Sequence, residues 1–150
     1  VREHLARGLD CLKSLPDVAQ QRMGVMGFSL GGYLVLMMAS RDDVKGVVSS
    51  YGAYHGTPVS LVLTEYSLTD IAAQARAPVL MLHGDADTTA PISRANSTHR
   101  LLVERGKQAE LVVYPGAEHE FDKVGRPFFD AKATADARAR TLAFLAARLK

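Results

Sequence analysis

The most informative stretch of this sequence is "VMGFSLGGY", residues 25–33, which sets one serine and three glycines between two apolar segments. The short apolar run from Met23 to Phe28 predicts a buried strand. The longer run that follows, from Leu30 to about Ser40, is apolar nearly all round, as in a helix packed inside a protein. Ser29 therefore stands at a sharp break between a strand and a helix. Glycines suit such a break because they carry no Cβ atom to crowd it.

Segments with strand and helix patterns alternate along the rest of the chain. Further short apolar runs predict strands at 44–51, 79–83 and 109–114. Helical patterns are expected at about 5–15, 68–74, 93–105 and 130–149, and an irregular loop at 52–67. Because the strands are continuously apolar rather than alternating, they suit a parallel sheet covered on both faces. The predicted fold class is therefore α/β, with right-handed crossovers between the strands.

The composition is that of an ordinary soluble globular protein, with 47% hydrophobic and 23% charged residues. A length of 150 residues fits a single domain over 1–150. The net charge of +2 is spread without a basic block, so neither a nucleic-acid nor a membrane partner is expected. No apolar run approaches the ~20 residues of a membrane span. The lone cysteine, Cys11, excludes an internal disulfide and fits a reducing compartment, so a cytoplasmic location is expected.

The residues around Ser29 match the pattern G-x-S-x-G, from Gly27 to Gly31, where a strand gives way to a helix. This is the sequence context of a nucleophile elbow, a turn so tight that it forces the serine into unfavourable backbone angles. The helix then begins beneath the serine, and the backbone N–H of Leu30 becomes a candidate oxyanion donor. A serine hydroxyl is a poor nucleophile at neutral pH, so it needs a base and a group that orients the base.

Five histidines are candidates for the base. His4 and His99 fall on predicted helices, and His83 falls inside a strand, where a packed or turn-stabilising role is expected. His55 lies in the long loop and could reach a site, although nothing in its local sequence demands it. His119 alone follows the end of a strand within a glycine-bearing loop, so His119 is predicted to be the base.

The orienting acid is expected in "LHGDADTTAP", residues 82–91, which directly follows a predicted strand. Asp87 lies further into this turn, where its side chain can lean towards the next loop, and it is the predicted acid. Asp85 is expected to hydrogen-bond local backbone, as turn aspartates do. A metal site built from His83, Asp85 and Asp87 has neither a recognised ligand spacing nor a further ligand cluster, so no metal is expected.

The three predicted residues share one geometric property. Ser29, Asp87 and His119 each follow the carboxyl end of a predicted parallel strand, the edge where open α/β sheets bind ligands. Their order along the chain, serine then aspartate then histidine, is the order of the α/β-hydrolase triad. The sequence therefore predicts one catalytic site at this edge.

Four motifs carry a resemblance to a known family. They are "GFSLGG" at 27–32, "APVLMLHGDADTTAP" at 77–91, "YPGAEHEF" at 114–121 and the tail "TLAFLAARL" at 141–149. With them, essentially the whole chain resembles the dienelactone hydrolase family of the α/β hydrolases. The resemblance implies an α/β-hydrolase fold, here the C-terminal half of a parallel sheet of about four strands flanked by helices. It also implies Ser29 as nucleophile, His119 as base and Asp87 as acid.

Two departures from the family pattern concern the substrate. Dienelactone hydrolases proper carry a cysteine at the nucleophile position, where this chain has Ser29, and serine-bearing relatives are generally assigned as esterases. The family's substrate-binding arginine, four residues beyond the histidine, is Lys123 here, with Arg126 nearby. A lysine lacks the planar fork that grips a carboxylate through two bonds. Lys123 is a candidate substrate contact, and Tyr54 and His55 in the long loop are expected to border the acyl pocket.

A further expectation concerns the strands that precede the elbow in the family. They would amount to several βα units, on the order of 100 residues at roughly 30 per unit, and they normally supply the second oxyanion donor. This chain opens on Val1, in the helix just before the elbow strand. The strand at 23–28 would then lie at an open edge, so a homodimer or association with an N-terminal half is expected.

The predicted function is that of a serine hydrolase that cleaves carboxylic esters or lactones through an acyl-enzyme, with a small-molecule substrate and no cofactor. Two alternatives stay open. One is a serine peptidase of the prolyl-oligopeptidase type, which shares the elbow and the order of the triad. The other is a truncated, non-catalytic hydrolase half that acts as a binding or assembly module.

Overall fold

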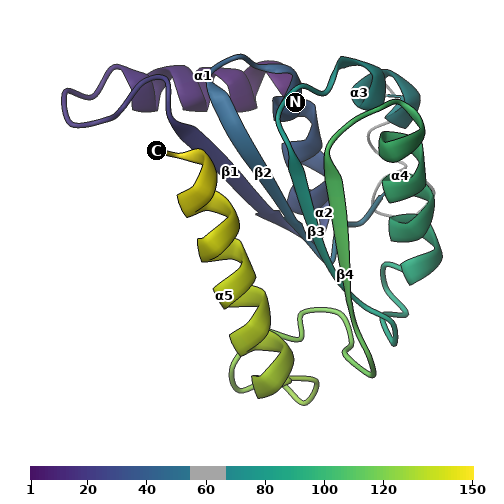
Figure 1. Cartoon of the computed structure of the whole chain (residues 1–150). Coiled ribbons are helices and arrows are strands. Elements are labelled where there is room, and N and C mark those ends of the chain that lie inside the picture. The colour runs from purple at the N-terminus through teal and green to yellow at the C-terminus, as the bar shows by residue number, and fades with distance from the viewer. Residues whose placement is uncertain (55–66) are drawn as a thin grey trace.

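A parallel β-sheet forms the centre of the computed structural model, which describes residues 1–54 and 67–150. Within these residues the sheet has four strands in the order β1-β2-β3-β4, and every neighbouring pair is parallel. The strands are β1 (Met23–Phe28), β2 (Val44–Ser50), β3 (Val79–Gly84) and β4 (Ala109–Tyr114). All four therefore point the same way, and the loops at their carboxyl ends lie together at one edge of the sheet (Figure 1). The predicted α/β fold with a parallel sheet is confirmed.

The strands alternate with helices along the chain. The helices are α1 (Arg2–Lys13), α2 (Leu30–Leu34), the 3₁₀ helix η1 (Val35–Ser40), α3 (Leu68–Gln74), α4 (Ile92–Glu104) and α5 (Ala131–Arg148). The single helix expected from residue 30 to 40 is divided, because its second half tightens into 3₁₀ geometry, which is common towards a helix C-terminus. None of the helices within the described residues combines the length and the apolar composition that a bilayer span needs.

The two central strands, β2 and β3, bury side chains on both faces of the sheet. Successive residues point to opposite faces, so Val47 belongs to one apolar cluster and Val48 to the other. The Val47 cluster is built with side chains of α1, α2, η1, α3 and α4, whereas the Val48 cluster is built with α5. Figure 1 shows α5 on the opposite side of the sheet from α2 and α4. The continuous apolar runs of β2 and β3 are thus explained by burial on both sides.

Strand β1 lies at one edge of the sheet formed by the described residues, as expected. Two of its apolar side chains are exposed, Met26 at 39% and Phe28 at 43%, and Leu142 of α5 is exposed at 59%. These three residues line a cavity of about 260 Å³ between β1 and α5. Association through this edge, with a second copy or with another segment, stays a prediction.

A buried carboxylate ties α1 to the turn that leads into β2. Asp43 is only 6% exposed, and its two oxygens accept hydrogen bonds from Arg41 at 2.9 and 2.7 Å. Lys13, the last residue of α1, donates to the same carboxylate at 2.9 Å. The hydrogen bonds from Arg41, together with the Lys13 ammonium, hold the pKa of Asp43 well below its usual range. The charged form of Asp43 therefore stabilises the folded state.

Asp43→Asn is expected to lower the free energy of unfolding by about 2 kcal/mol at neutral pH, since it removes hydrogen bonds between charged groups. Because the folded pKa is depressed, this contribution is present above the unfolded pKa, near 3.8, and is lost as the pH falls below it. Urea denaturation at a series of pH values measures both effects. Asp42→Asn is the matched control, because Asp42 is 82% exposed in its pair with Arg76 and should contribute little. Equal losses in the two variants would contradict the assignment.

Candidate active site

Ser29 occupies a strained turn between β1 and α2. Its backbone angles are φ 52° and ψ −121°, a region that residues with a Cβ atom rarely adopt. The turn is held from β2: the Ser29 N–H donates to the Ser50 carbonyl at 3.1 Å, and the Ser29 carbonyl accepts from Ala53 N–H at 2.9 Å. The strain is therefore compensated by two hydrogen bonds to the neighbouring strand end.

Two positions of the turn require glycine because there is no space there for a Cβ atom. A Cβ atom on Gly27 would lie 2.1 Å from the Gly31 carbonyl oxygen, and one on Gly32 would lie 2.9 Å from Gly52 Cα. Both contacts are closer than real Cβ atoms make, so these positions admit only glycine without a backbone shift. At Gly31, in contrast, a Cβ atom would meet nothing within 4 Å. The close approach of the helix to the sheet is thus made at Gly27 and Gly32 and does not require a glycine at position 31.

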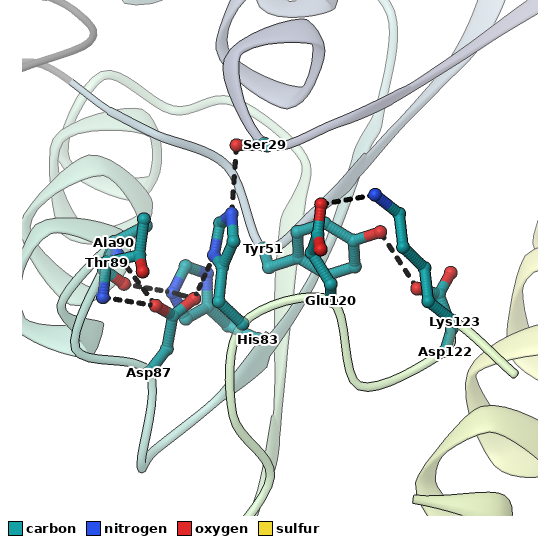
Figure 2. A network of polar contacts seen from close by, with 10 residues as sticks. Ser29, Tyr51, His83, Asp87, Thr89, Ala90, Glu120, Asp122 and Lys123 are labelled. Atoms are coloured by element: carbon teal, nitrogen blue, oxygen red, sulfur yellow. Dashed lines mark hydrogen bonds and ion pairs between the residues drawn. The ribbon is translucent and has the colours of Figure 1, made fainter. Parts of the chain in front are cut away.

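The structure brings Ser29, His119 and Asp87 together in one line of hydrogen bonds (Figure 2). His119 Nε2 lies 2.9 Å from Ser29 Oγ, and His119 Nδ1 lies 2.7 Å from Asp87 Oδ2. A carboxylate can only accept, so Nδ1 carries the proton and Nε2 is free to accept the serine O–H. In this arrangement a base stands against a hydroxyl and a carboxylate stands behind the base.

The Asp87 side chain is fully buried, and its carboxylate is held by its own turn. Its Oδ1 atom accepts from the backbone N–H groups of Thr89, at 2.9 Å, and Ala90, at 2.7 Å. The Oδ2 atom is left for His119. The carboxylate therefore accepts three hydrogen bonds, and the two from the backbone fix its orientation.

Asp85 links two loops rather than capping its own. It was expected to bond local backbone, but its Oδ1 atom accepts from Gly116 N–H at 2.6 Å, in the loop that carries His119. The next residue, Ala86, donates its N–H to the Ala117 carbonyl at 3.1 Å. The loops after β3 and β4 are thus joined along their length, because neighbouring parallel strands end side by side. This junction holds Asp87 next to His119.

His83 is the packed histidine that the sequence predicted. It is fully buried, and its Nε2–H donates to the Ala90 carbonyl at 2.7 Å. Burial lowers the pKa of His83, so the ring is neutral near pH 7. In the part of the chain that the structure describes, no three His, Cys, Asp or Glu side chains are grouped to hold a metal ion.

The three predicted substrate contacts have different outcomes. Tyr54 is 1% exposed, and its hydroxyl lies 2.6 Å from Ser49 Oγ inside the core, so its placement does not support the expected contact with a substrate. His55 lies outside the described residues. Lys123 does line a cavity of about 330 Å³ beside Ser29, and its ammonium forms an ion pair with Glu120. Figure 2 marks this ion pair with a dashed line.

Tyr51 is a residue of this site that sequence reasoning missed. Its ring lies edge-on to the ring of His119, with centroids 5.0 Å apart, and its hydroxyl donates to Asp122 at 2.8 Å. The signal was present, since Tyr51 follows the carboxyl end of a strand, as Ser29 does. In the predicted strand at 44–51, Tyr51 is only the last residue, and no role was expected for it.

A parallel sheet with a strained serine at its carboxyl edge, facing a histidine and an aspartate, defines the α/β-hydrolase fold class. Within that class, the sequence matches the dienelactone hydrolase family over residues 1–149. The chain belongs to this family.

Individual relatives agree with this family. A protein of Methylorubrum extorquens, provisionally named a carboxymethylenebutenolidase, is 34% identical over 77% of this chain and 39% of its own length. The crystal structure of a provisionally named dienelactone hydrolase from Klebsiella pneumoniae superposes with a TM-score of 0.81 at 28% identity, over 97% of this chain and 60% of that one. An acylaminoacyl peptidase of Pyrococcus horikoshii reaches the same TM-score at 19% identity, over 99% of this chain and 28% of that one, and so shares the fold. This chain therefore spans less than two thirds of the length of these relatives.

Gly27→Ala is expected to destabilise the fold by about 2 kcal/mol or more, because the added Cβ atom meets backbone that cannot move aside. Gly31→Ala is the matched control in the same turn. It should be neutral or stabilise by up to about 1 kcal/mol, since alanine favours a helix and the site is open. Urea denaturation of both variants provides the measurement, and a Gly31→Ala loss as large as that of Gly27→Ala would show that the packing of the turn is misread.

Proposed function

We propose that this protein is a serine hydrolase that cleaves carboxylic esters or lactones. The observation that carries the proposal is the continuous line of hydrogen bonds from Asp87 through His119 to Ser29, at 2.7 and 2.9 Å. Each atom in this line has the donor or acceptor role that serine activation needs. The family supports a hydrolase, and the names of its relatives favour ester or lactone chemistry.

In the proposed reaction, Ser29 Oγ attacks the carbonyl carbon of the substrate while its proton passes to His119 Nε2. Asp87 holds the Nδ1–H tautomer and stabilises the imidazolium that forms. The C–O bond to the leaving alcohol then breaks, and His119 returns the proton to that alcohol. Water, activated by His119, attacks the acyl-enzyme and releases the acid and free Ser29. A lactone keeps its alcohol within the same product.

The developing oxyanion needs a hydrogen-bond donor close to Ser29. Leu30 is the first residue of α2, and the N–H groups of the first residues of a helix lack an acceptor within the helix. We assign the Leu30 N–H to this role, because it follows the nucleophile directly, as the elbow motif requires. A second donor is expected from elsewhere in the protein.

The charges beside Ser29 favour a substrate without a carboxylate. The cavity is lined by Glu120, Asp122 and Lys123, which together carry more negative than positive charge. The Lys123 ammonium is engaged by Glu120, so its charge is offset before any substrate enters. A neutral ester or lactone therefore fits this surface better than an anionic one.

A fluorophosphonate probe is expected to add one label to the full-length protein, and peptide mapping should place it on Ser29. Ser29→Ala removes one hydroxyl and should abolish labelling while thermal unfolding stays unchanged. Hydrolysis of short aryl esters, assayed beside aminoacyl-proline amides, then identifies the substrate class. Amide cleavage that exceeds ester cleavage would favour a peptidase. A folded protein that neither labels nor hydrolyses would favour a binding module.

Asp87→Asn is expected to lower kcat on the order of 10,000-fold, because the amide stabilises the wrong histidine tautomer, as in other Ser-His-Asp triads. Asp85→Asn is the control from the same loop. Its amide oxygen can still accept the Gly116 N–H, so the loss in kcat should be far smaller. Steady-state kinetics on an aryl ester measure both variants, and the reverse order of effects would overturn the choice of acid.

A further inference from the structure

Tyr51 stands at the carboxyl end of β2 in a backbone conformation that needs support. Its φ angle is 36°, in the left-handed region that residues other than glycine rarely adopt. Its N–H donates to the Leu82 carbonyl at 2.7 Å, and its side chain is 2% exposed. Strain of this kind persists only where the surroundings fix the residue, and it is concentrated at functional sites. The ring of Tyr51 is therefore held in one place.

The ring fills the space between the elbow strand and the histidine loop. It lies 5.0 Å from the ring of His119 at an interplanar angle of 67°, 5.7 Å from Phe121, and 5.8 Å from Phe28, the residue before Ser29. Edge-to-face contacts at these distances are attractive and directional. One buried ring thus contacts both segments that must meet for the Ser29–His119 hydrogen bond to form.

The hydroxyl of Tyr51 anchors the same loop three residues beyond the histidine. It donates to Asp122 Oδ1 at 2.8 Å (Figure 2). Burial, together with the Asp122 carboxylate, raises the pKa of Tyr51, so the hydroxyl keeps its proton and remains a donor. Between the two contact points lies Glu120, whose φ angle of 60° is also in the left-handed region. The loop from 119 to 122 is therefore a strained segment fixed at both ends by one side chain.

The hydrogen bond to Asp87 does not by itself fix the orientation of the His119 ring, so a second residue is needed to position it. One hydrogen bond from His119 Nδ1 to Asp87 fixes a single point of the imidazole, and the ring can still swing about that bond. Among the residues that the structure describes, the titratable groups that interact with His119 besides Asp87 include Glu120, which is paired with Lys123, and His83, which donates to Ala90. Apart from the hydrogen bonds at its two nitrogens, the imidazole contacts the ring of Tyr51, which lies edge-on to it and opposes that swing.

We propose that Tyr51 is the positioning residue of His119: its ring stops the imidazole from swinging away from Ser29, and its hydroxyl holds the loop through Asp122. The kinetic part of this inference rests on the proposed function. Because Tyr51 also lines the cavity beside Ser29, the alternative is that it acts as a wall for the substrate. Replacing a residue that only lines the substrate pocket would change KM, whereas replacing a positioning residue changes kcat.

Kinetics of four variants of the full-length protein separate the two parts of the side chain. Tyr51→Leu should lower kcat for a small aryl ester by about 10- to 100-fold, as expected when a reacting group is misplaced, with KM unchanged. Tyr51→Phe keeps the ring and should lose less. Asp122→Ala should match Tyr51→Phe, and the double variant should be no worse than either, because both remove the same bond.

Tyr114 provides the matched control. It is also a buried tyrosine at a strand end, it packs on Phe121, and its hydroxyl donates to Asp136 at 3.0 Å. Its ring packs against Phe121, whereas the ring that packs against His119 is that of Tyr51. Tyr114→Leu should therefore cost stability as Tyr51→Leu does, while kcat stays at the wild-type value. Equal losses of kcat in the two leucine variants would overturn the proposal and leave Tyr51 as a packing residue.

A readout that needs no turnover separates this proposal from the proposed function. The His119 Nδ1 proton, hydrogen-bonded to Asp87, should give a protected downfield ¹H NMR resonance, assigned by its loss in His119→Gln. In Tyr51→Leu the resonance should broaden or disappear, and in Tyr114→Leu it should persist. A sharp, unchanged resonance in Tyr51→Leu would overturn the positioning role, as would a raised KM at constant kcat. If the wild type neither labels nor hydrolyses, the proposed function fails, and the resonance still decides the role of Tyr51.

Discussion

The site depends on how the backbone of Ser29 is held. Its φ of 52° is costly for a residue with a side chain, and the carboxyl end of β2 offsets that cost through the Ser50 carbonyl and the Ala53 N–H. This clamp requires β1 and β2 to be adjacent and parallel, and it requires Gly32 to let the helix approach Gly52. The strand order, the glycines of the turn and the orientation of the Ser29 side chain therefore depend on one another.

Much of this arrangement could be predicted from the sequence, because it follows from local pattern and one rule of topology. The strands at 23–28 and 109–114 have the expected bounds, since short apolar runs between turn residues can fold in few other ways. Ser29, Asp87 and His119 could be brought together in advance because each follows a strand of one parallel sheet. This rule predicts which loops lie close together, but it does not predict which of their atoms form hydrogen bonds.

The remaining contacts depend on loop geometry that no local pattern contains. Asp85 bonds Gly116, 31 residues away, and Tyr51 bonds Asp122, 71 residues away, so neither partner is visible in the neighbouring sequence. Tyr54 is buried with its hydroxyl against Ser49 of β2, a contact that the expectation of an irregular loop at 52–67 did not predict. Side chains at strand ends are where such long-range pairs form, and there sequence reasoning is weakest.

The junction between the loops after β3 and β4 has a consequence for how this site can change. Asp85, Ala86 and Asp87 are hydrogen-bonded to the loop of Gly116, Ala117 and His119, so Asp87 and His119 form one preassembled unit. Ser29 belongs to a separate turn, which meets this unit through the Ser29–His119 hydrogen bond and through the Tyr51 ring that packs on Phe28 and His119. Under the proposed function, a different nucleophile, for example a cysteine, could stand at position 29 without rebuilding the Asp87–His119 pair.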